Sequence, residues 1–182
     1  MEGILLVVVV MGLFALISSN RFKMLRKMAD KVFVAFQETA TNKYEALNRW
    51  LNETGSQAEL KGDADNLRSL GQLLAETKKS DITIDQQVAL ENSISKLERS
   101  IEDLAVGKEV QHNFHENTGS AYLEAKNKTR EMKKQYNETV MHYNNAVFLF
   151  PSNVFALIFG FKQRKTFIME NTASDNQQTK DK

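Results

Sequence analysis

The sequence predicts an all-α protein in which an N-terminal transmembrane helix precedes an antiparallel up-down four-helix bundle. The first observation behind this prediction is an unbroken apolar run at the N-terminus. The second is that apolar residues later recur at steps of three and four, the period of an amphipathic helix. The third is composition, because 182 residues include one proline and eight glycines, the residues that break helices.

The membrane anchor is predicted over residues 1–20. From Gly3 to Ile17 no side chain is charged. Counted from Met1 to Ser19, the run is just long enough for the roughly 20 helical residues that a bilayer core of about 30 Å requires. A cleaved signal peptide is the alternative, but it needs a positive start, whereas Glu2 is the only charge before the run. An uncleaved anchor is therefore favoured. The side chains expected inside the bilayer include Ile4, Leu5, Val8, Leu13, Phe14 and Ile17.

Positive charges follow the anchor and predict its orientation. They are Arg21, Lys23, Arg26, Lys27 and Lys31. Because basic residues beside a membrane span stay on the cytoplasmic side, we expect a single-pass protein with its N-terminus outside and its bundle in the cytoplasm. The expected location is the cell (inner) membrane or an intracellular membrane compartment. The absence of cysteine agrees with a reducing compartment.

The bundle is predicted over residues 21–150. The first helix continues the anchor to about residue 54, and the second and third cover 56–79 and 80–107. The fourth begins between residues 108 and 115 and ends before Pro151. The first helix is expected to bury a stripe of Phe22, Leu25, Met28, Val32, Phe36, Ala40, Tyr44, Leu47 and Leu51. An even number of antiparallel helices should return the chain to the membrane end.

A second apolar run follows in residues 151–170, the predicted membrane-proximal aromatic segment. Its core, Val154 to Phe161, is too short to span a bilayer. It can cap the bundle core or lie among lipid headgroups with its basic residues toward anionic lipid, and both alternatives stay open. The candidate surface residues are Phe150, Pro151, Phe155, Ile158, Phe159, Phe161, Lys162, Arg164 and Lys165. Residues 171–182 are polar and are predicted to be a disordered tail.

The C-terminal third of the chain carries a repeated pattern: Tyr136-Asn137 and Tyr143-Asn144, then Phe150-Pro151-Ser152-Asn153 and Phe159-Gly160-Phe161. This pattern resembles the C-terminal signature of the LemA family. The resemblance implies a single-pass membrane protein with a helical-bundle domain and no established enzymatic activity. It also implies that some relatives take part in building magnetosome membranes and that others are encoded beside membrane proteases.

The tyrosines and asparagines of this signature have two interpretations. Tyr136 and Tyr143 lie seven residues apart, on one face of a helix, and Asn137 and Asn144 lie on the next. The favoured interpretation is core packing by the tyrosines, with rim amides that fix helix register. The alternative is that the asparagines form a recognition ledge for a partner.

Catalytic and metal-binding patterns are weak in this sequence. The histidines are His112, His115 and His142, and Glu109 with His112 forms a single Glu-x-x-His. A di-metal carboxylate bundle needs two such motifs, so we expect no bound metal or cofactor. No paired acid and base, nucleophile elbow or phosphate loop is present, which argues against an enzyme. A net charge of +1 argues against nucleic acid as a partner.

The function favoured by these observations is a membrane-anchored, non-enzymatic scaffold or adaptor of the LemA type. Its expected partners are the lipid bilayer and a protein that the sequence does not name, and the oligomeric state stays open. The alternative is a membrane-remodelling protein that inserts its C-terminal aromatic segment into lipid. A metal-storage bundle is a third hypothesis.

Overall fold

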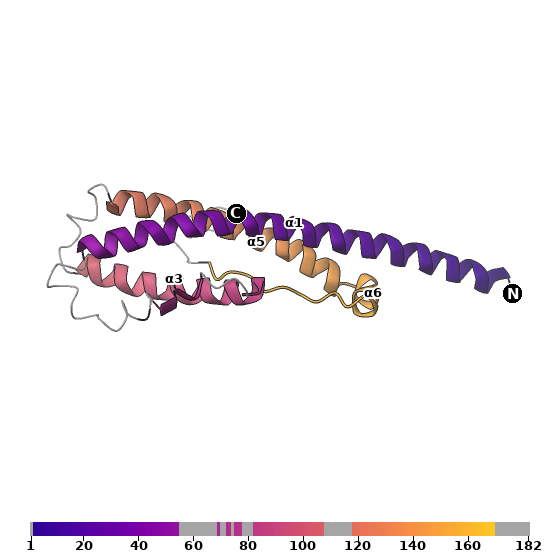
Figure 1. Cartoon of the computed structure of the whole chain (residues 1–182). Coiled ribbons are helices and arrows are strands. Elements are labelled where there is room, and N and C mark those ends of the chain that lie inside the picture. Colours follow the sequence, from indigo (N-terminus) through magenta and orange to yellow (C-terminus); the bar gives the residue numbers. More distant parts are fainter. Residues whose placement is uncertain are drawn as a thin grey trace, which may run out of the picture.

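The computed structural model describes residues 2–54, 69, 72, 73, 75–77, 82–107 and 118–169. This part of the chain contains α1 (Glu2–Thr54), α3 (Ile84–Gly107), α5 (Thr118–Phe148) and α6 (Ser152–Ile158), and it contains no strand (Figure 1). The all-α prediction is therefore confirmed. Most of the predicted second helix, the chain between 108 and 117, and the predicted tail lie outside the described residues.

Helix α1 has two halves with different surroundings. Figure 1 shows its N-terminal half extending beyond the other elements, while its C-terminal half packs beside α3 and α5. Its large apolar side chains from Ile4 to Ile17 stay exposed, from 39% at Phe14 to 73% at Ile4. Among the described residues, α1 is the helix that is long and apolar enough to cross a membrane. The predicted apolar N-terminal helix is thus present and is not part of the core.

The C-terminal half of α1 buries a face that differs in part from the predicted stripe. Met28 was expected inside but is 51% exposed, whereas Phe33 is buried. The reason is that α3, α5 and the segment after α6 all pack on α1. The buried face of α1 is therefore set by three neighbours and is not a single straight stripe. On α1 that face consists of Phe22, Ala29, Phe33, Phe36, Ala40, Lys43, Ala46, Leu47 and Trp50.

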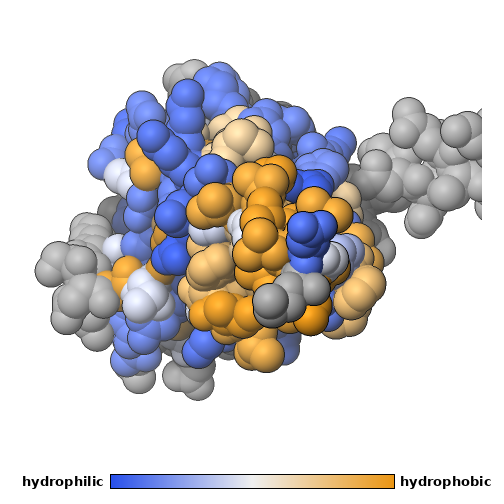
Figure 2. All heavy atoms as spheres, turned by 90° about the vertical axis from the view of Figure 1, so that its right-hand side faces the viewer, coloured by the Kyte–Doolittle hydropathy of each residue, from blue (hydrophilic) through white to orange (hydrophobic). Residues whose placement is uncertain are grey.

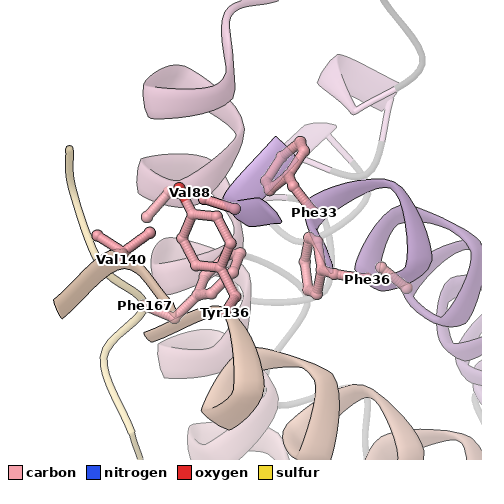
Figure 3. Packing of buried hydrophobic residues seen from close by; sticks show 8 residues of the cluster. Phe33, Phe36, Val88, Tyr136, Val140 and Phe167 are labelled. Carbon is pink, nitrogen blue, oxygen red and sulfur yellow. The ribbon is translucent and has the colours of Figure 1, made fainter. Parts of the chain in front are cut away.

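The core is divided into three clusters along the bundle axis. At the end next to the apolar half of α1, Phe22 packs with Tyr143 and Phe155. The middle cluster joins α1 and α5 through Phe33, Phe36 and Tyr136 (Figure 3), and the far cluster centres on Trp50 and Tyr122, whose rings stack at 5.7 Å. Fully burying a large apolar side chain contributes about 1.5–3 kcal/mol, so each cluster stabilises the packing of the helices that it joins.

Helix α6 turns the chain back along the bundle. It ends in a Schellman motif, in which Phe161 N–H donates to the Ala156 carbonyl at 2.8 Å and Gly160 N–H to the Leu157 carbonyl at 3.2 Å. Gly160 has φ +71°, a left-handed conformation that a residue without Cβ adopts without strain. The chain then continues without helical turns through residues 161–169, which we call the strap. Figure 1 shows the strap running back along the bundle beside α3.

Candidate functional site

Helix α6 lies beside the apolar half of α1. The rings of Phe14 and Phe155 are 5.5 Å apart, and those of Phe22 and Phe161 are 5.1 Å apart. The end of α5 and the whole of α6 therefore return to the level where the apolar half of α1 meets the bundle. The sequence predicted such a return from four antiparallel helices, of which the second lies mostly outside the described residues.

The two faces of α6 differ in exposure. Phe155 and Ala156 are buried against α1 and α5, whereas Leu157 is 83% exposed and Ile158 68%. Large apolar residues in the preceding turn are also exposed, with Phe150 at 82%. Figure 2 views the molecule from the end that carries the N-terminus and shows hydrophobic residues gathered there. One face of the segment thus caps the core, and the other face is exposed.

The candidate surface residues divide in the same way. Phe150, Pro151, Ile158, Phe159, Lys162 and Lys165 are exposed. Phe155 lies at this end of the bundle but is buried, and Phe161 is half-buried. The Arg164 guanidinium lies 2.7 Å from Asp30 Oδ1 on α1, and its side chain is 12% exposed. Arg164 therefore holds the strap to α1 and does not extend into solvent.

Asn137 and Asn144 on α5 bind the backbone of the strap. The Asn144 amide accepts a hydrogen bond from Arg164 N–H at 2.8 Å and donates one to the Arg164 carbonyl at 2.9 Å. Asn137 makes the same pair of bonds with Phe167, both at 2.8 Å. These side chains therefore do not act as rim amides between helices, which was the favoured interpretation. They hold a separate segment of chain.

The spacing of the asparagines matches the geometry of an extended chain. Seven residues of α-helix rise about 10.5 Å, and three residues of extended chain cover about 10 Å. Asn137 and Asn144 can therefore bind strap residues that lie three apart. The repeat of seven in the signature is the spacing that fits an extended segment lying along α5.

Helix α3 repeats this arrangement on the other side of the strap. Asp85 Oδ1 accepts from Lys165 N–H at 3.3 Å, and Asn92 Oδ1 accepts from Ile168 N–H at 2.8 Å. Asp85 and Asn92 are also seven residues apart and also bind strap residues three apart. The strap thus lies in a groove between two helices, and each helix binds a different pair of its amides. Sequence reasoning missed Asp85 and Asn92, although their heptad spacing repeats that of the α5 pair.

Phe167 is the apolar anchor of the strap. Its side chain is 3% exposed and lies among three rings of the middle cluster (Figure 3). Ring centroids are 4.4 Å away at Phe36, 5.1 Å at Tyr136 and 6.4 Å at Phe33. Nearer the apolar half of α1, the Tyr143 hydroxyl donates to the Lys162 carbonyl at 2.8 Å. Both signature tyrosines are buried, and both contact the strap.

Four charged residues occupy the interior between the middle and far clusters. We call Lys43, Glu91, Glu98 and Lys133 the charge cluster. Lys43 Nζ lies 2.7 Å from Glu91 and 3.0 Å from Glu98, and Lys133 Nζ lies 2.7 Å from Glu91. The Lys43, Glu91 and Glu98 side chains are about 1% exposed, and Lys133 is 9% exposed. Two cations and two anions balance, so the interior carries no net charge from this group.

Neutral side chains complete the charge cluster. The Tyr44 hydroxyl donates to Glu91, and Lys133 donates to Ser95 Oγ at 2.7 Å. Thr129, nearby on α5, donates to the Thr39 carbonyl of α1 at 3.1 Å. A cavity of about 20 Å³ adjoins the cluster between Glu98 and Lys133, with room for one water molecule. These contacts tie α1, α3 and α5 together at one level.

The ionisation of the charge cluster follows from burial and pairing. Burial opposes ionisation of Glu91, but the charges of Lys43 and Lys133 outweigh it and lower the Glu91 pKa to about 2. For Glu98, burial dominates and raises the pKa, because the Lys43 charge compensates only in part and Glu91 adds repulsion. Burial also lowers the pKa of Lys133. Burial acts against the charge on Lys43 too, but the two carboxylates outweigh it and raise the pKa.

No metal site is visible in the part of the chain that the structure describes, which contains no group of three His, Cys, Asp or Glu side chains suited to an ion. His142 is an exposed residue of α5. Glu109, His112 and His115 lie outside the described residues.

The fold and the site define a class of helical-bundle protein with a long apolar N-terminal helix and a C-terminal strap bound along the bundle. The model of the LemA family matches residues 13–180, nearly the whole chain, and the protein therefore belongs to the LemA family. The resemblance seen in the sequence is confirmed. No curated protein and no solved structure matches the chain.

Proposed function

We propose that this chain is a membrane-anchored, non-enzymatic scaffold or adaptor that presents its bundle to a protein partner at the membrane surface. The observation that carries the proposal is the apolar half of α1, which stays exposed from Ile4 to Ile17 although the rest of α1 packs in a core. A contiguous apolar surface of this extent is stable when lipid covers it. Membership of the LemA family supports the same function.

The proposed orientation places the bundle in the cytoplasm and the short N-terminus outside. Arg21, Lys23 and Lys27 are exposed just after the apolar half of α1, where they can contact headgroups on the cytoplasmic side. The same side chains would have to cross the bilayer in the opposite orientation, at a cost of several kcal/mol.

Alkaline extraction and cysteine labelling test the anchor and its orientation separately. The protein should remain in the membrane pellet at high pH, and release into the supernatant would contradict the anchor. Because the chain has no cysteine, single variants report position cleanly. In intact cells an impermeant maleimide should label Glu2→Cys but not Lys128→Cys, which lies on an exposed part of α5. The reverse pattern would contradict the orientation.

A second candidate function is insertion of α6 into the cytoplasmic leaflet, which would let the protein bend or organise the membrane. The exposed face of α6 favours it, because Leu157 and Ile158 face outward at the level where the apolar half of α1 enters the bundle. Burying three or four such side chains at about 1.5–3 kcal/mol each gives reversible binding without spanning. Exposed Lys162 and Lys165 should each add up to about 1 kcal/mol on anionic lipid.

Fluorescence from the full-length protein in lipid nanodiscs tests this insertion. A polarity-sensitive dye on Leu157→Cys should shift to the blue, more strongly in anionic than in neutral lipid, while the same dye on Lys128→Cys should not. Equal spectra at the two positions would contradict insertion. Substitution of Phe155 cannot serve as the test, because that side chain is 6% exposed and belongs to the core.

A further inference from the structure

The groove between α3 and α5 recognises the backbone of the strap. Among the described residues, eight hydrogen bonds join helix side chains to strap backbone groups, with Asp85, Asn92, Asn137, Tyr143 and Asn144 as the helix residues. A backbone amide or carbonyl is the strap partner in every one of them. Groups that every residue carries therefore supply these hydrogen bonds, while Arg164 adds a side-chain ion pair to Asp30 of α1.

One side chain of the strap supplies the apolar recognition. Of the nine described strap residues, Phe167 is the buried one, while Lys162, Gln163, Lys165, Thr166 and Ile168 are exposed. The groove is thus a binding site for an extended peptide that places one aromatic ring between Phe36 and Tyr136. A segment that meets this requirement is present in every copy of the chain, because it is the strap itself.

We propose that the groove also binds the strap of a second copy, so that neighbouring molecules in the membrane exchange straps and assemble. In the exchanged pair each strap makes the same hydrogen bonds and the same ring contacts that it makes within one chain. Because these contacts are the same, the free-energy cost of the exchange is mainly that of bringing two molecules together. Exchange of an identical element is for this reason an easy route to dimers. The proposal rests on the proposed anchoring, since a shared bilayer raises the effective concentration of neighbouring copies.

The geometry of the strap suits such an exchange. The strap begins directly after Gly160, whose left-handed backbone ends α6. A change of the backbone torsions at Gly160 can redirect the strap while α6 stays packed on Phe22 and Tyr143. The hydrogen bonds of the strap begin at Lys162, two residues after Gly160, so a strap that keeps them all reaches about 7 Å beyond its hinge and the two grooves must lie close together. A twofold axis along the membrane normal places both hinges at the same height, so each strap enters the partner groove at its proper end.

Cross-linking between differently tagged full-length chains tests the exchange. One copy carries Asp85→Cys, on α3, and the other carries Lys165→Cys, on the strap, two positions that are adjacent when a strap occupies the groove. Treatment of membranes with a short bis-maleimide should give a dimer that carries both tags. The matched control pairs Lys165→Cys with Lys128→Cys, an exposed position of α5. The groove pair should yield about tenfold more mixed-tag dimer than the control pair, because the strap holds its two cysteines together.

Further variants separate exchange from collision and from misfolding. Adding Phe167→Asp to the Lys165→Cys copy should abolish the mixed-tag dimer, because the aromatic anchor is lost. A single chain with both cysteines should cross-link internally even when diluted in detergent, which shows that the variants are folded with an occupied groove. Internal cross-links without mixed-tag dimers in membranes would overturn the exchange, as would equal yields from the groove and control pairs. Alkaline extraction of the same membranes reports on the anchor independently, so loss of the anchor and loss of exchange are distinguishable.

Discussion

The charge cluster and the strap groove both place polar groups inside the bundle, but they satisfy them differently. In the charge cluster, side chains from three helices pair with one another, and Lys43 and Glu91 meet across 48 positions of sequence. In the groove, side chains such as those of Asn137 and Asn144 pair with the backbone of a separate segment. Each member of the charge cluster is therefore tied to a particular partner residue, whereas the groove is tied to a backbone shape and one ring.

This difference determines what each region can do. Removing one charge from the cluster leaves an opposite charge buried without compensation, so the region tolerates little change. The groove distributes its hold over hydrogen bonds to backbone groups, each worth about 0.5–1.5 kcal/mol, and the strap's ion pair, Arg164 with Asp30, involves a carboxylate that is 43% exposed. Substitutions in the two regions should differ in size accordingly.

The largest effect is expected from Lys43→Ala. It leaves Glu91 and Glu98 in the interior with Lys133 as the only cluster cation, and breaking such a buried pair costs about 3–5 kcal/mol. Thermal unfolding of the full-length protein in detergent measures it. The control, Lys43→Met with Glu98→Gln, keeps the Glu91–Lys133 pair and restores neutrality, so it should recover most of the loss. If the double variant is no more stable than Lys43→Ala, charge balance is not what holds this region.

Acid should act mainly on Glu91. Folding lowers its pKa to about 2 from the ordinary value of 4.5. A carboxyl whose pKa falls on folding stabilises the protein above the unfolded pKa, and that contribution is lost as pH drops from about 4.5 toward 2. Glu98 has the opposite sign: its raised pKa costs stability as pH rises above 4.5, and it adds no pH dependence below.

Melting temperatures measured between pH 2 and pH 5 report this loss of stability, because the pH range covers the folded and the unfolded pKa of Glu91. Glu91→Gln should lower stability at neutral pH and flatten the acid limb of the curve. Wild-type and variant curves that fall in parallel would show that other carboxyls control the acid response.

A smaller effect is expected at Asn137. Asn137→Ala leaves the N–H and carbonyl of buried Phe167 without partners, which costs about 1–3 kcal/mol. Hydrogen exchange of the strap amides should speed up more than exchange in the helices, because the strap can open locally without unfolding of the whole bundle. Asn137→Asp keeps the acceptor for Phe167 N–H but loses the donor, so it should fall between the wild type and Asn137→Ala. Unchanged strap exchange in Asn137→Ala would contradict the assignment.

At Asn144 the cost should be smaller still, about 1 kcal/mol. Its partner Arg164 is only half-buried, so water can replace the lost hydrogen bonds. Comparing the Asn137→Ala and Asn144→Ala melts sharpens the contrast within the groove. A larger loss at Asn144 would mean that its end of the strap is the better protected one.

The smallest effect on stability is expected on the exposed face of α6. Leu157→Ser removes a side chain that is 83% exposed, so the melt in detergent should change by less than about 0.5 kcal/mol. The same variant should weaken the lipid-dependent signal of a dye placed at Ile158→Cys. A large loss of stability would show that Leu157 belongs to the core, in contrast to its neighbour across the helix.

Local patterns in the sequence were sufficient for the long helices α1, α3 and α5 and for their C-terminal ends, whereas α6 was not predicted as a helix. An unbroken apolar run predicts a helix that lipid can cover, and Pro151 ends the long helix because proline lacks the N–H that a helix needs. The repeat of seven at Asn137 and Asn144 was visible as well, since helical periodicity places both on one face. The spacing of apolar and polar residues and the local composition can be read from the sequence without knowing which segments pack together.

Only the tertiary structure decided which groups meet. No local pattern marks Glu91 and Glu98 of α3 as buried, because their ammonium partners lie on α1 and α5. The partners of Asn137 and Asn144 are backbone groups 20 and 30 residues away, and every residue carries such groups, so sequence cannot single them out. Side-chain period fixes the face that a helix presents, but contact partners depend on how distant segments pack. Because of that packing, Asn137 and Asn144, which the sequence placed at the rim of the core, bind the backbone of the strap.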